Sequence, residues 1–329
     1  MILCRTPCRM SFVGGGTDIP AFYRQHGGAV VSTSIRNYVN VVVNPKFDGG
    51  VRVSYSRTEL CEHSSEVEHP IVREALRMLN IPRGIEIVSI ADVPSSGTGL
   101  GSSSSFTVAL LNALHAFKSE RATKEQLGAE SCRIEIDILG EPIGKQDQYA
   151  AAFGGLNFIR FNEDDTVDVE PLNCIYQVEK KIETSIITFY TGIARRAGDV
   201  LQAQNDVIAS GARTSVLKRM AAQAIELRDE LRRGNVEALG EALHEGWRLK
   251  QSITPQISNS QIANWYDRAR AAGAIGGKLL GAGAGGFLVF FANPDQHEAI
   301  RRELAELRPV NLRLDRDGSQ VIFADSGFQ

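Results

Sequence analysis

The feature that most constrains the fold is a run of small residues, SSGTGLGSSSS, at positions 95 to 105. A strand-like segment, IEIVSIADVP, precedes it, and an apolar segment with helical spacing, FTVALLNALHAF, follows it. A flexible linker would be flanked by polar sequence of low complexity, so these flanks favour a strand, a tight loop and a helix. We therefore expect the run to form a loop between the end of a strand and the start of a helix.

The composition of this loop suits a phosphate group. Gly97, Gly99 and Gly101 permit positive φ angles and a close approach of the backbone to a ligand. The serines at 102–105 occupy the first turn of the expected helix, where backbone N–H groups have no partner inside the helix. Oriented N–H groups at a helix N-terminus bind phosphate. On the loop alone, a phosphate site and an ordinary serine-capped turn both remain open.

Two known phosphate loops do not match. A Walker A loop needs a lysine after its last glycine, and none follows Gly101. A dinucleotide fingerprint needs G-x-G-x-x-G, and Ser102 stands at the last glycine position. The later stretch GAGAGG, residues 281–286, does fit that pattern, but it leads into the strand-like FLVFF, whereas the fingerprint opens a helix.

The composition is that of an ordinary globular chain. Of its 329 residues, 43% are hydrophobic and 23% are charged, with a formal net charge of −3. We therefore expect neither nucleic acid nor an acidic membrane as a partner, and neither a signal peptide nor a membrane span. The cysteines form no C-x-x-C pair, which favours free thiols and a cytoplasmic location; they are Cys4, Cys8, Cys61, Cys132 and Cys174.

Strand and helix patterns alternate along the whole chain, which predicts an α+β protein. β-Branched alternation predicts strands at 29–35, 38–44, 51–56, 85–90, 154–161, 185–191, 287–291 and 320–324. Helical spacing predicts helices at 69–79, 106–117, 123–139, 144–153, about 198–250, 258–273 and 297–307. Near residue 183 the pattern changes: a strand is followed by a long helical tract rich in Ala, Leu, Arg and Glu. We therefore predict two domains, residues 1–183 and 184–329.

Three motifs occur in order along the chain: RTPCRMSFVGGGTDIPAFY, VPSSGTGLGSSSS and GGKLLGAGAGGFLVFF. Together they resemble the signature motifs of the GHMP kinases, the family of galactokinase, homoserine kinase, mevalonate kinase and phosphomevalonate kinase. The resemblance extends over nearly the full length. It implies an N-terminal domain like domain 2 of ribosomal protein S5, a ferredoxin-like C-terminal domain, and ATP and Mg²⁺ as cofactors.

The resemblance also assigns roles in phosphate and metal binding. It implies a triphosphate cradle made of Gly97, Gly99, Leu100, Gly101, Ser102, Ser103 and Ser104. Ser103 would supply a hydroxyl to Mg²⁺. The segment IEIDILGEPIGKQDQ is similar to a galactokinase segment in which Glu135 would bind Mg²⁺ and Asp147 would be the general base. Mg²⁺ prefers oxygen ligands, and a carboxylate near the acceptor hydroxyl can take its proton.

Further roles concern the acceptor and the transferred phosphoryl group. Arg9 resembles the family arginine near the γ-phosphate, and Asp18 resembles the aspartate that binds sugar hydroxyls. Gly15 and Gly16 replace the Glu and His of the usual galactokinase motif, which speaks against galactose and predicts room for a bulkier sugar. Further residues expected to line the substrate site are Gly16, Thr17, Gly283 and Lys145. Lys145 lies two residues before Asp147, so it could favour the ionised form of the Asp147 carboxyl group or touch a substrate phosphate.

A narrower pattern concerns the substrate. GGGTD, GKQDQYAAAFGG, YTGIARRAGDVLQAQ and GWRLKQSITPQISN resemble the bacterial kinases of D-glycero-D-manno-heptose 7-phosphate and, more distantly, the L-fucose kinases. The resemblance implies a sugar phosphate acceptor, phosphorylated at its anomeric hydroxyl to the 1,7-bisphosphate on the way to a GDP-heptose. A substrate that already bears phosphate needs a basic anchor, for which the candidates are Arg195, Arg196, Lys250, Lys145 and Arg36.

Three alternatives stay open at this point. The chain could phosphorylate a free sugar such as L-fucose, or it could bind sugars without turnover. A nicotinamide dehydrogenase that uses GAGAGG is the third, although Arg9, Asp18, Ser103, Glu135 and Asp147 together favour a kinase. The oligomeric state, monomer or homodimer, does not follow from the sequence.

Overall fold

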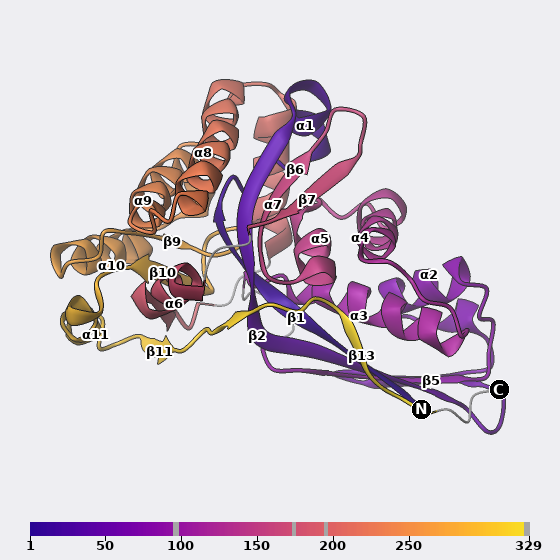
Figure 1. The fold of residues 1–329 in the computed structure, drawn as a ribbon. Coiled ribbons are helices and arrows are strands. Elements are labelled where there is room, and N and C mark those ends of the chain that lie inside the picture. The colour runs from indigo at the N-terminus through magenta and orange to yellow at the C-terminus, as the bar shows by residue number, and fades with distance from the viewer. Residues whose placement is uncertain (95–98, 173–175, 194–196, 326–329) are drawn as a thin grey trace.

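The structure, a computed structural model, describes residues 1–94, 99–172, 176–193 and 197–325, without the side chains of Ala197 and Asp199. Within these ranges the strands form a larger sheet of nine strands and a smaller sheet of four (Figure 1). Helices pack against both sheets, which lie at opposite sides of the molecule. The predicted α+β class is confirmed.

The larger sheet is organised around one long strand. Its described strands are β1 (Ile2–Val13), β2 (Gly28–Pro45), β3 (Val51–Ser54), β4 (Thr58–Cys61), β5 (Ile85–Ala91), β6 (Leu156–Phe161), β7 (Val167–Pro171), β12 (Leu314–Asp315) and β13 (Gln320–Ala324). Their order is β13-β1-β2-β5-β3-β4, with β6 and β12 also paired to β2, and β7 paired to β6. With 18 residues, β2 is long enough to pair with different partners along its length.

The sequence divides β2 into two strands, 29–35 and 38–44, but the structure has one. Its pairing with β1 runs antiparallel and shifts register between Pro7, opposite Tyr38, and Cys8, opposite Ile35. A bulge of this kind lets a strand bend without ending. The polar Arg36 and Asn37 at the bulge therefore interrupt the hydrophobic pattern but not the strand.

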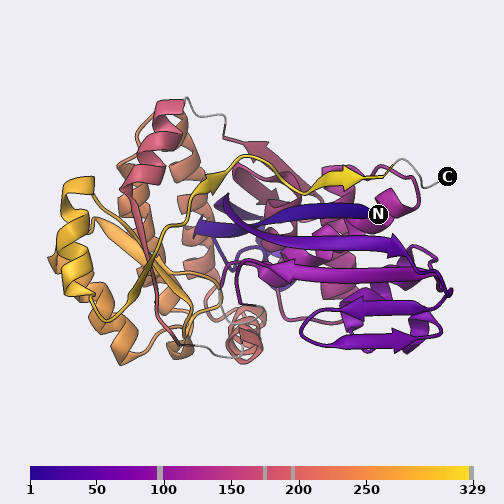
Figure 2. The same ribbon diagram turned by 90° about the horizontal axis from the view of Figure 1, so that it is seen from below.

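One group of helices covers one face of the larger sheet, and Figure 2 shows strands of the opposite face in front; on that face α8 (Thr214–Arg232) packs on β2 and β6, where Arg228 lies over the Phe158 ring. The covering segments are α2 (Pro70–Met78), α3 (Ser102–Phe117), α4 (Lys124–Cys132), the π-helix η2 (Arg133–Ile138) and α5 (Gln146–Phe153). α3 packs directly on β1 and β2. Its residues Val108, Leu110, Leu111 and Leu114 are fully buried in the core of this layer.

The predicted helix at 123–139 has two parts with different hydrogen bonding. Thr123 caps α4 by accepting a bond from the Gln126 N–H at 3.1 Å, as expected, but the Gln126 side chain donates to Glu130 instead of completing a capping box. After Cys132 the chain continues as the six-residue π-helix η2 and stops before Gly140, which has φ +68°. π-Helical turns often occur at functional sites, and this one carries Glu135.

The smaller sheet is ferredoxin-like, as the resemblance implied. It contains β8 (Ile186–Tyr190), β9 (Gly276–Leu279), β10 (Phe287–Phe291) and β11 (Arg308–Val310). The order is β11-β8-β10-β9, and every described pairing is antiparallel. Helices separate the first strand from the second and the third from the fourth, which gives the βαββαβ pattern.

The long helical tract predicted at 198–250 forms three helices. They are α7 (Ala197–Ala209), α8 (Thr214–Arg232) and α9 (Ala238–Gln251). Breaks fall at Gly211 and Gly234, where φ is +73° and +82°. The remaining helical segments are α1 (Pro20–His26), η1 (Ser64–Glu66), α6 (Tyr176–Ser185), η3 (Pro255–Ile257), α10 (Ser260–Ala271), η4 (Pro294–Gln296) and α11 (His297–Glu303).

The end of the chain corrects the predicted assignment of residues 184–329 to one domain. The smaller sheet begins close to the predicted boundary, at Ile186, but β12 and β13 return to the larger sheet. Leu314 pairs with Ile35, and Ala324 pairs with Ile2. Local sequence predicts that 320–324 is a strand but not which sheet it joins. The boundary at 183/184 remains a proposal, and it concerns only the first passage of the chain from the larger sheet to the smaller one.

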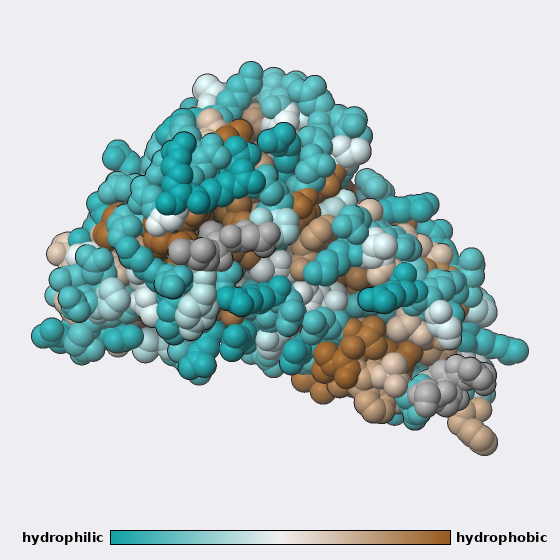
Figure 3. All heavy atoms as spheres, in the orientation of Figure 1, coloured by the Kyte–Doolittle hydropathy of each residue, from teal (hydrophilic) through white to brown (hydrophobic). Residues whose placement is uncertain are grey.

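Two surface properties complete the fold. In Figure 3 the surface over α8 and α9 is largely hydrophilic, and an apolar area lies at the lower right, near β13. Val321, Ile322 and Phe323 of that strand are all exposed. Within the described ranges, no helix combines the length and apolar character needed to cross a membrane. The described cysteines all carry free thiols, and Cys174 lies outside these ranges.

Candidate active site

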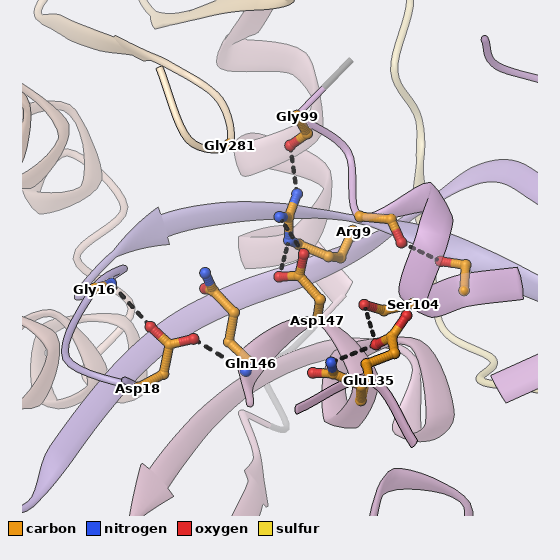
Figure 4. Close-up of polar contacts among 12 residues, drawn as sticks. Arg9, Gly16, Asp18, Gly99, Ser104, Glu135, Gln146, Asp147 and Gly281 are labelled. Atoms are coloured by element: carbon orange, nitrogen blue, oxygen red, sulfur yellow. Dashed lines mark hydrogen bonds and ion pairs between the residues drawn. The ribbon is translucent and has the colours of Figure 1, made fainter. Parts of the chain in front are cut away.

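Arg9 and Asp147 form a buried ion pair at the centre of the candidate site (Figure 4). Arg9 comes from β1, and Asp147 stands in the first turn of α5. The Arg9 Nε and Nη2 atoms each donate to a different Asp147 oxygen at 2.7 Å. This two-bond fork fixes the plane of the carboxylate. Because the Asp147 side chain is still 22% exposed, it can be reached by a ligand.

The glycine-rich loop lies against this pair. The Arg9 Nη1 donates to the Gly99 carbonyl at 2.5 Å, and the Arg9 backbone N–H donates to the Leu100 carbonyl at 2.9 Å. Gly101 has φ +73° and leads directly into α3. A Cβ on Gly101 would lie 3.2 Å from both the Arg9 Cγ and the Asp147 Oδ2. The predicted strand, loop and helix arrangement therefore brings the helix N-terminus to Asp147. Of the predicted cradle, Gly97 lies outside the described residues.

The loop also touches the third motif. A Cβ on Gly99 would lie 2.3 Å from the Leu280 carbonyl oxygen, and Gly281 has φ +77° at the same contact. Only glycine tolerates both the contact and the angle. Gly283, a predicted substrate residue, packs instead on the backbone of Ile257, where a Cβ would lie 2.7 Å from the carbonyl oxygen. The GAGAGG stretch leads into β10, so it does not open a helix as a dinucleotide fingerprint would.

Glu135 is buried and held by three hydrogen bonds. Its Oε2 accepts from the Ser104 hydroxyl at 2.8 Å and from the Gln148 amide at 2.5 Å, and its Oε1 accepts from the Thr107 hydroxyl at 2.8 Å. Burial, which outweighs the lowering effect of these three donors and is aided by the charge of Asp147, raises the pKa of Glu135 to about 7. A cation near this carboxyl group would favour its ionised form.

The serine that meets Glu135 is Ser104, whereas the resemblance pointed to Ser103. Ser104 is buried, while Ser103 is exposed on the first turn of α3. The set of Glu135 and serine hydroxyls consists of hard oxygen atoms, which fits Mg²⁺. Mg²⁺ with ATP commonly uses one or two carboxylates together with phosphates and water. Among the described residues, no group of three or more His, Cys, Asp or Glu side chains is arranged to hold a metal ion. The metal roles of Ser103 and Glu135 stay predictions.

Asp18 lies close to the start of α5, on the other side of Gln146 from Asp147. Its Oδ1 accepts from the Gly16 N–H at 2.8 Å, and its Oδ2 accepts from the Gln146 N–H at 3.2 Å. Burial raises the pKa of Asp18, and the charge of Asp147 adds to this effect, while the two backbone donors oppose it. The two carboxylates that the sequence assigned to the acceptor are thus brought to one site from β1–α1 and α5.

Two neighbouring predictions are changed by the packing. The hydroxyl of Thr17 both donates to and accepts from the backbone of Ala29 at 3.0 Å, so its single proton is already used and it cannot donate to a sugar. The room predicted beside Gly16 is filled by the buried Gln204, whose Nε2 would lie 2.7 Å from a Cβ there. Open space for a sugar does not follow from the glycine at that position.

Gln146 and Ser11 are polar residues of the site that sequence reasoning missed. A Cβ on Gly15 would lie 3.5 Å from the Gln146 Nε2 and 3.6 Å from the Ser11 hydroxyl oxygen. In the described part of the chain, the buried Gln146 Oε1 and Ser11 Oγ have no hydrogen-bond partner. Unpaired buried polar atoms beside Asp18 can bind a hydroxylated ligand. The signal available in the sequence was the proximity of both residues to Asp147 and Asp18 in the motifs.

The predicted phosphate anchors are dispersed. Arg195 and Arg196 lie outside the described residues. Arg36 is exposed and donates to the Leu314 carbonyl at 3.0 Å. The Lys145 Nζ donates to the Asp165 carbonyl at 3.0 Å and lies 4.9 Å from the ring centre of Tyr23, so it faces away from Asp147. Lys250 is buried and lies near Arg9, as described below.

Comparison with known families finds the same two halves. The model of the GHMP kinases N-terminal domain matches residues 56–155, and the model of the GHMP kinases C-terminal domain matches residues 227–309. Together the two models match more than half of the chain, and they follow in the expected order.

Individual relatives match over most of the length. The D-glycero-α-D-manno-heptose 7-phosphate kinase of Campylobacter jejuni is 29% identical over 321 residues, which are 92% of this chain and 94% of that protein. The bifunctional fucokinase/GDP-fucose pyrophosphorylase of Arabidopsis thaliana is 25% identical over 94% of this chain and 31% of its own length.

Solved structures share the fold. A D-glycero-D-manno-heptose 1-phosphate kinase from Bacteroides thetaiotaomicron superposes with a TM-score of 0.80 at 24% identity, covering 98% of this chain and 100% of that one. Lactococcus lactis galactokinase superposes with a TM-score of 0.77 at 16% identity, covering 98% and 95%.

Proposed function

Since this chain belongs to the GHMP kinase family and is an ATP-dependent phosphotransferase with a hydroxyl acceptor, we propose that its acceptor is D-glycero-D-manno-heptose 7-phosphate. The phosphorylated group is the anomeric hydroxyl, and the product is the 1,7-bisphosphate, on the way to a GDP-heptose. The observation that carries the phosphoryl transfer is the Arg9–Asp147 fork, which lies directly against Gly101 at the start of α3.

The reaction follows from this geometry. The acceptor oxygen forms a bond to the γ-phosphorus, and the bond from that phosphorus to the β,γ-bridging oxygen breaks, leaving its electron pair on ADP. The hydroxyl proton passes to the Asp147 carboxylate, which Arg9 holds in a fixed plane. The N–H groups of the first turn of α3 face the phosphates.

Mg²⁺, when bound, neutralises charge on the phosphates, and Glu135 with a serine hydroxyl of α3 would hold it. The buried, hydrogen-bonded position of Glu135 supports this role, because the carboxylate is fixed in orientation before any ligand binds.

The choice of acceptor rests on two observations. The relative from C. jejuni, whose name gives the heptose 7-phosphate as its substrate, aligns with 92% of this chain. Asp18, with the unpartnered Gln146 Oε1 and Ser11 Oγ, supplies polar atoms for several sugar hydroxyls. Which basic residue anchors the 7-phosphate stays a prediction, for which Arg195 and Arg196 remain candidates. The cytoplasmic location and a monomeric or homodimeric state belong to the proposal as well.

A coupled assay of ADP release tests the acceptor. We expect turnover with D-glycero-D-manno-heptose 7-phosphate and little with L-fucose or D-galactose, and a product whose second phosphorus signal is coupled to the anomeric proton. Equal turnover with an unphosphorylated hexose would overturn the heptose assignment and favour a free-sugar kinase, which the likeness to the bifunctional fucokinase/GDP-fucose pyrophosphorylase of Arabidopsis makes the second candidate. Sugar binding without any ADP release would indicate a sensor.

A further inference from the structure

Lys250, on α9, is buried but has no carboxylate partner among the residues that the structure describes. It is 6% exposed, and its Nζ donates to the Gly281 carbonyl at 2.5 Å. In the part of the chain that the structure describes, no Asp or Glu oxygen lies within 4.0 Å of this ammonium. A lysine ammonium has three N–H donors, so burying it with one acceptor is costly unless an anion binds beside it.

The charged groups around Lys250 are those of the candidate active site. Burial lowers the pKa of Lys250 to about 8; the Arg9 charge lowers it too, and the charges of Asp18 and Asp147 raise it. Lys250 therefore lies near Arg9 and near the two carboxylates, Asp18 and Asp147, that face the acceptor. Its contact with Gly281 places it at the loop that touches Gly99.

A second buried lysine nearby differs in its surroundings. Lys278, on β9, donates to the Phe12 carbonyl at 3.0 Å, and the charges that act on it are those of Lys250 and Arg9. Burial lowers the pKa of Lys278 well below its ordinary value, which leaves Arg9 and Lys250 as the cations beside the acceptor carboxylates Asp18 and Asp147. Two cations in a site from which water is largely excluded suit a group that is strongly negative when it binds.

On the proposed function, which this inference presupposes, we propose that Lys250 is a catalytic residue whose ammonium contacts the phosphoryl group as it passes from ATP to the acceptor hydroxyl. The new bond to the acceptor oxygen and the broken bond to the bridging oxygen are those given above, and Lys250 exchanges no proton with either. Through Gly281 and Gly99, Lys250 lies next to the Arg9–Asp147 pair, where the reacting hydroxyl of the acceptor would lie. A phosphate at the far end of a seven-carbon sugar lies away from that end, so the remote anchor is another residue.

Steady-state kinetics of the full chain with Mg-ATP and the acceptor test this role. Lys250→Met keeps the length of the side chain and removes its charge, so we expect kcat to fall about 10²–10³-fold while KM for ATP changes less than about threefold. Lys250→Arg should recover at least about tenfold of that loss. Lys278→Met, which removes the other buried lysine amine, should lower kcat far less, because its contact is the Phe12 backbone.

Two further measurements separate chemistry from folding. The complex of ADP, aluminium fluoride and acceptor resembles the phosphoryl group in transit, so Lys250→Met should weaken this complex but not the binding of ADP alone. The active ammonium is lost as pH rises, so wild-type kcat/KM for the acceptor should fall above about pH 8, and Lys250→Arg should move that fall to higher pH. Besides Lys250, the titratable and charged groups facing this position are Arg9, Asp18, Asp147 and Lys278.

The outcomes are distinct. If wild type turns over another sugar but not the heptose phosphate, the proposed acceptor fails and the Lys250 comparison is made with that sugar. A wild type without any turnover overturns both proposals. If wild type is active and Lys250→Met keeps kcat within about threefold, or binds the aluminium fluoride complex as tightly, the role of Lys250 alone is overturned.

Discussion

Gly99 and Gly281 touch through their main chains, although they are 182 positions apart in the sequence: a Cβ on Gly281 would lie 2.3 Å from the Gly99 Cα. Each glycine is also fixed by a cation, since the Gly99 carbonyl accepts from Arg9 and the Gly281 carbonyl from Lys250. The contact therefore sets the separation between these two charges and joins the loops of the two sheets.

Gly281→Ala should separate the two loops. Gly281 has φ +77°, so alanine adds backbone strain as well as a clash, and we expect kcat to fall about 10²-fold, as for displacements near 1 Å, with a loss of about 1–3 kcal/mol of stability. Gly49→Ala is a matched control, because Gly49 has φ +80° but open space around a Cβ. Kinetics and urea unfolding of both variants check this. Wild-type kcat in Gly281→Ala would show that the contact does not position the site.

Asp147→Asn should abolish most turnover while nucleotide still binds. The amide cannot accept a proton, and its NH₂ group would face the Arg9 donors that now hold both carboxylate oxygens. We expect kcat to fall about 10²–10⁴-fold, with the dissociation constant of a fluorescent ATP analogue within about threefold of wild type. A variant with unimpaired kcat would remove Asp147 as the general base.

Much of the fold and of the site could be predicted from local sequence patterns. The loop between a strand and α3 follows from short-range signals, namely β-branched alternation, positive-φ glycines and helical spacing. The motifs containing Arg9, Gly101 and Asp147 were recognised in the sequence, and the structure brings these three residues into contact. Their meeting depends on the three motifs jointly, which is why no single loop was decisive.

The remaining features depend on tertiary packing. Whether Ser103 or Ser104 faces Glu135 is decided by the rotation of α3 against the π-helical turn, and a run of four serines contains no signal for it. The sequence names Lys250 as one of several basic candidates, but its burial arises from the packing of α9 on β9, which no local pattern indicates. The return of β13 to β1 is likewise a long-range pairing.

Ser104→Ala and Ser103→Ala should have different effects. Ser104→Ala removes a donor from the buried Glu135, so we expect a loss of about 1–3 kcal/mol of stability without Mg²⁺, whereas Ser103→Ala should lose less than about 0.5 kcal/mol. If Ser103 supplies the metal hydroxyl, its removal should raise the Mg²⁺ concentration for half-maximal rate several-fold. Thermal unfolding and Mg²⁺ titrations measure the two effects. An unchanged Mg²⁺ requirement in Ser103→Ala, with a raised one in Ser104→Ala, would transfer the metal role to Ser104.

The free energy of unfolding should depend on pH because His115 contacts two glutamates, Glu120 and Glu130. His115 is buried on α3, with Nδ1 3.0 Å from a Glu120 oxygen and Nε2 2.7 Å from a Glu130 oxygen. The hydrogen bond to Glu130 raises the pKa of His115, burial opposes this, and the bond to Glu120 adds to it. A raised folded-state pKa gives stability that is present in full below the unfolded pKa of about 6.5 and is lost as pH rises through the folded value.

His115→Gln removes this pH-dependent contribution. We expect wild type to be more stable than the variant by about 1.5–3 kcal/mol at pH 6, with the difference shrinking as pH rises above the folded-state pKa of His115. Urea unfolding of both proteins at half-unit steps of pH measures this difference, in which groups unaffected by the substitution cancel. His63→Gln, on an exposed residue whose Nδ1 contacts Ser65, is the control and should shift stability little at any pH. A wild-type advantage of the same size from pH 6 to pH 9 would mean that His115 stabilises α3 and α4 by packing alone, without its charge.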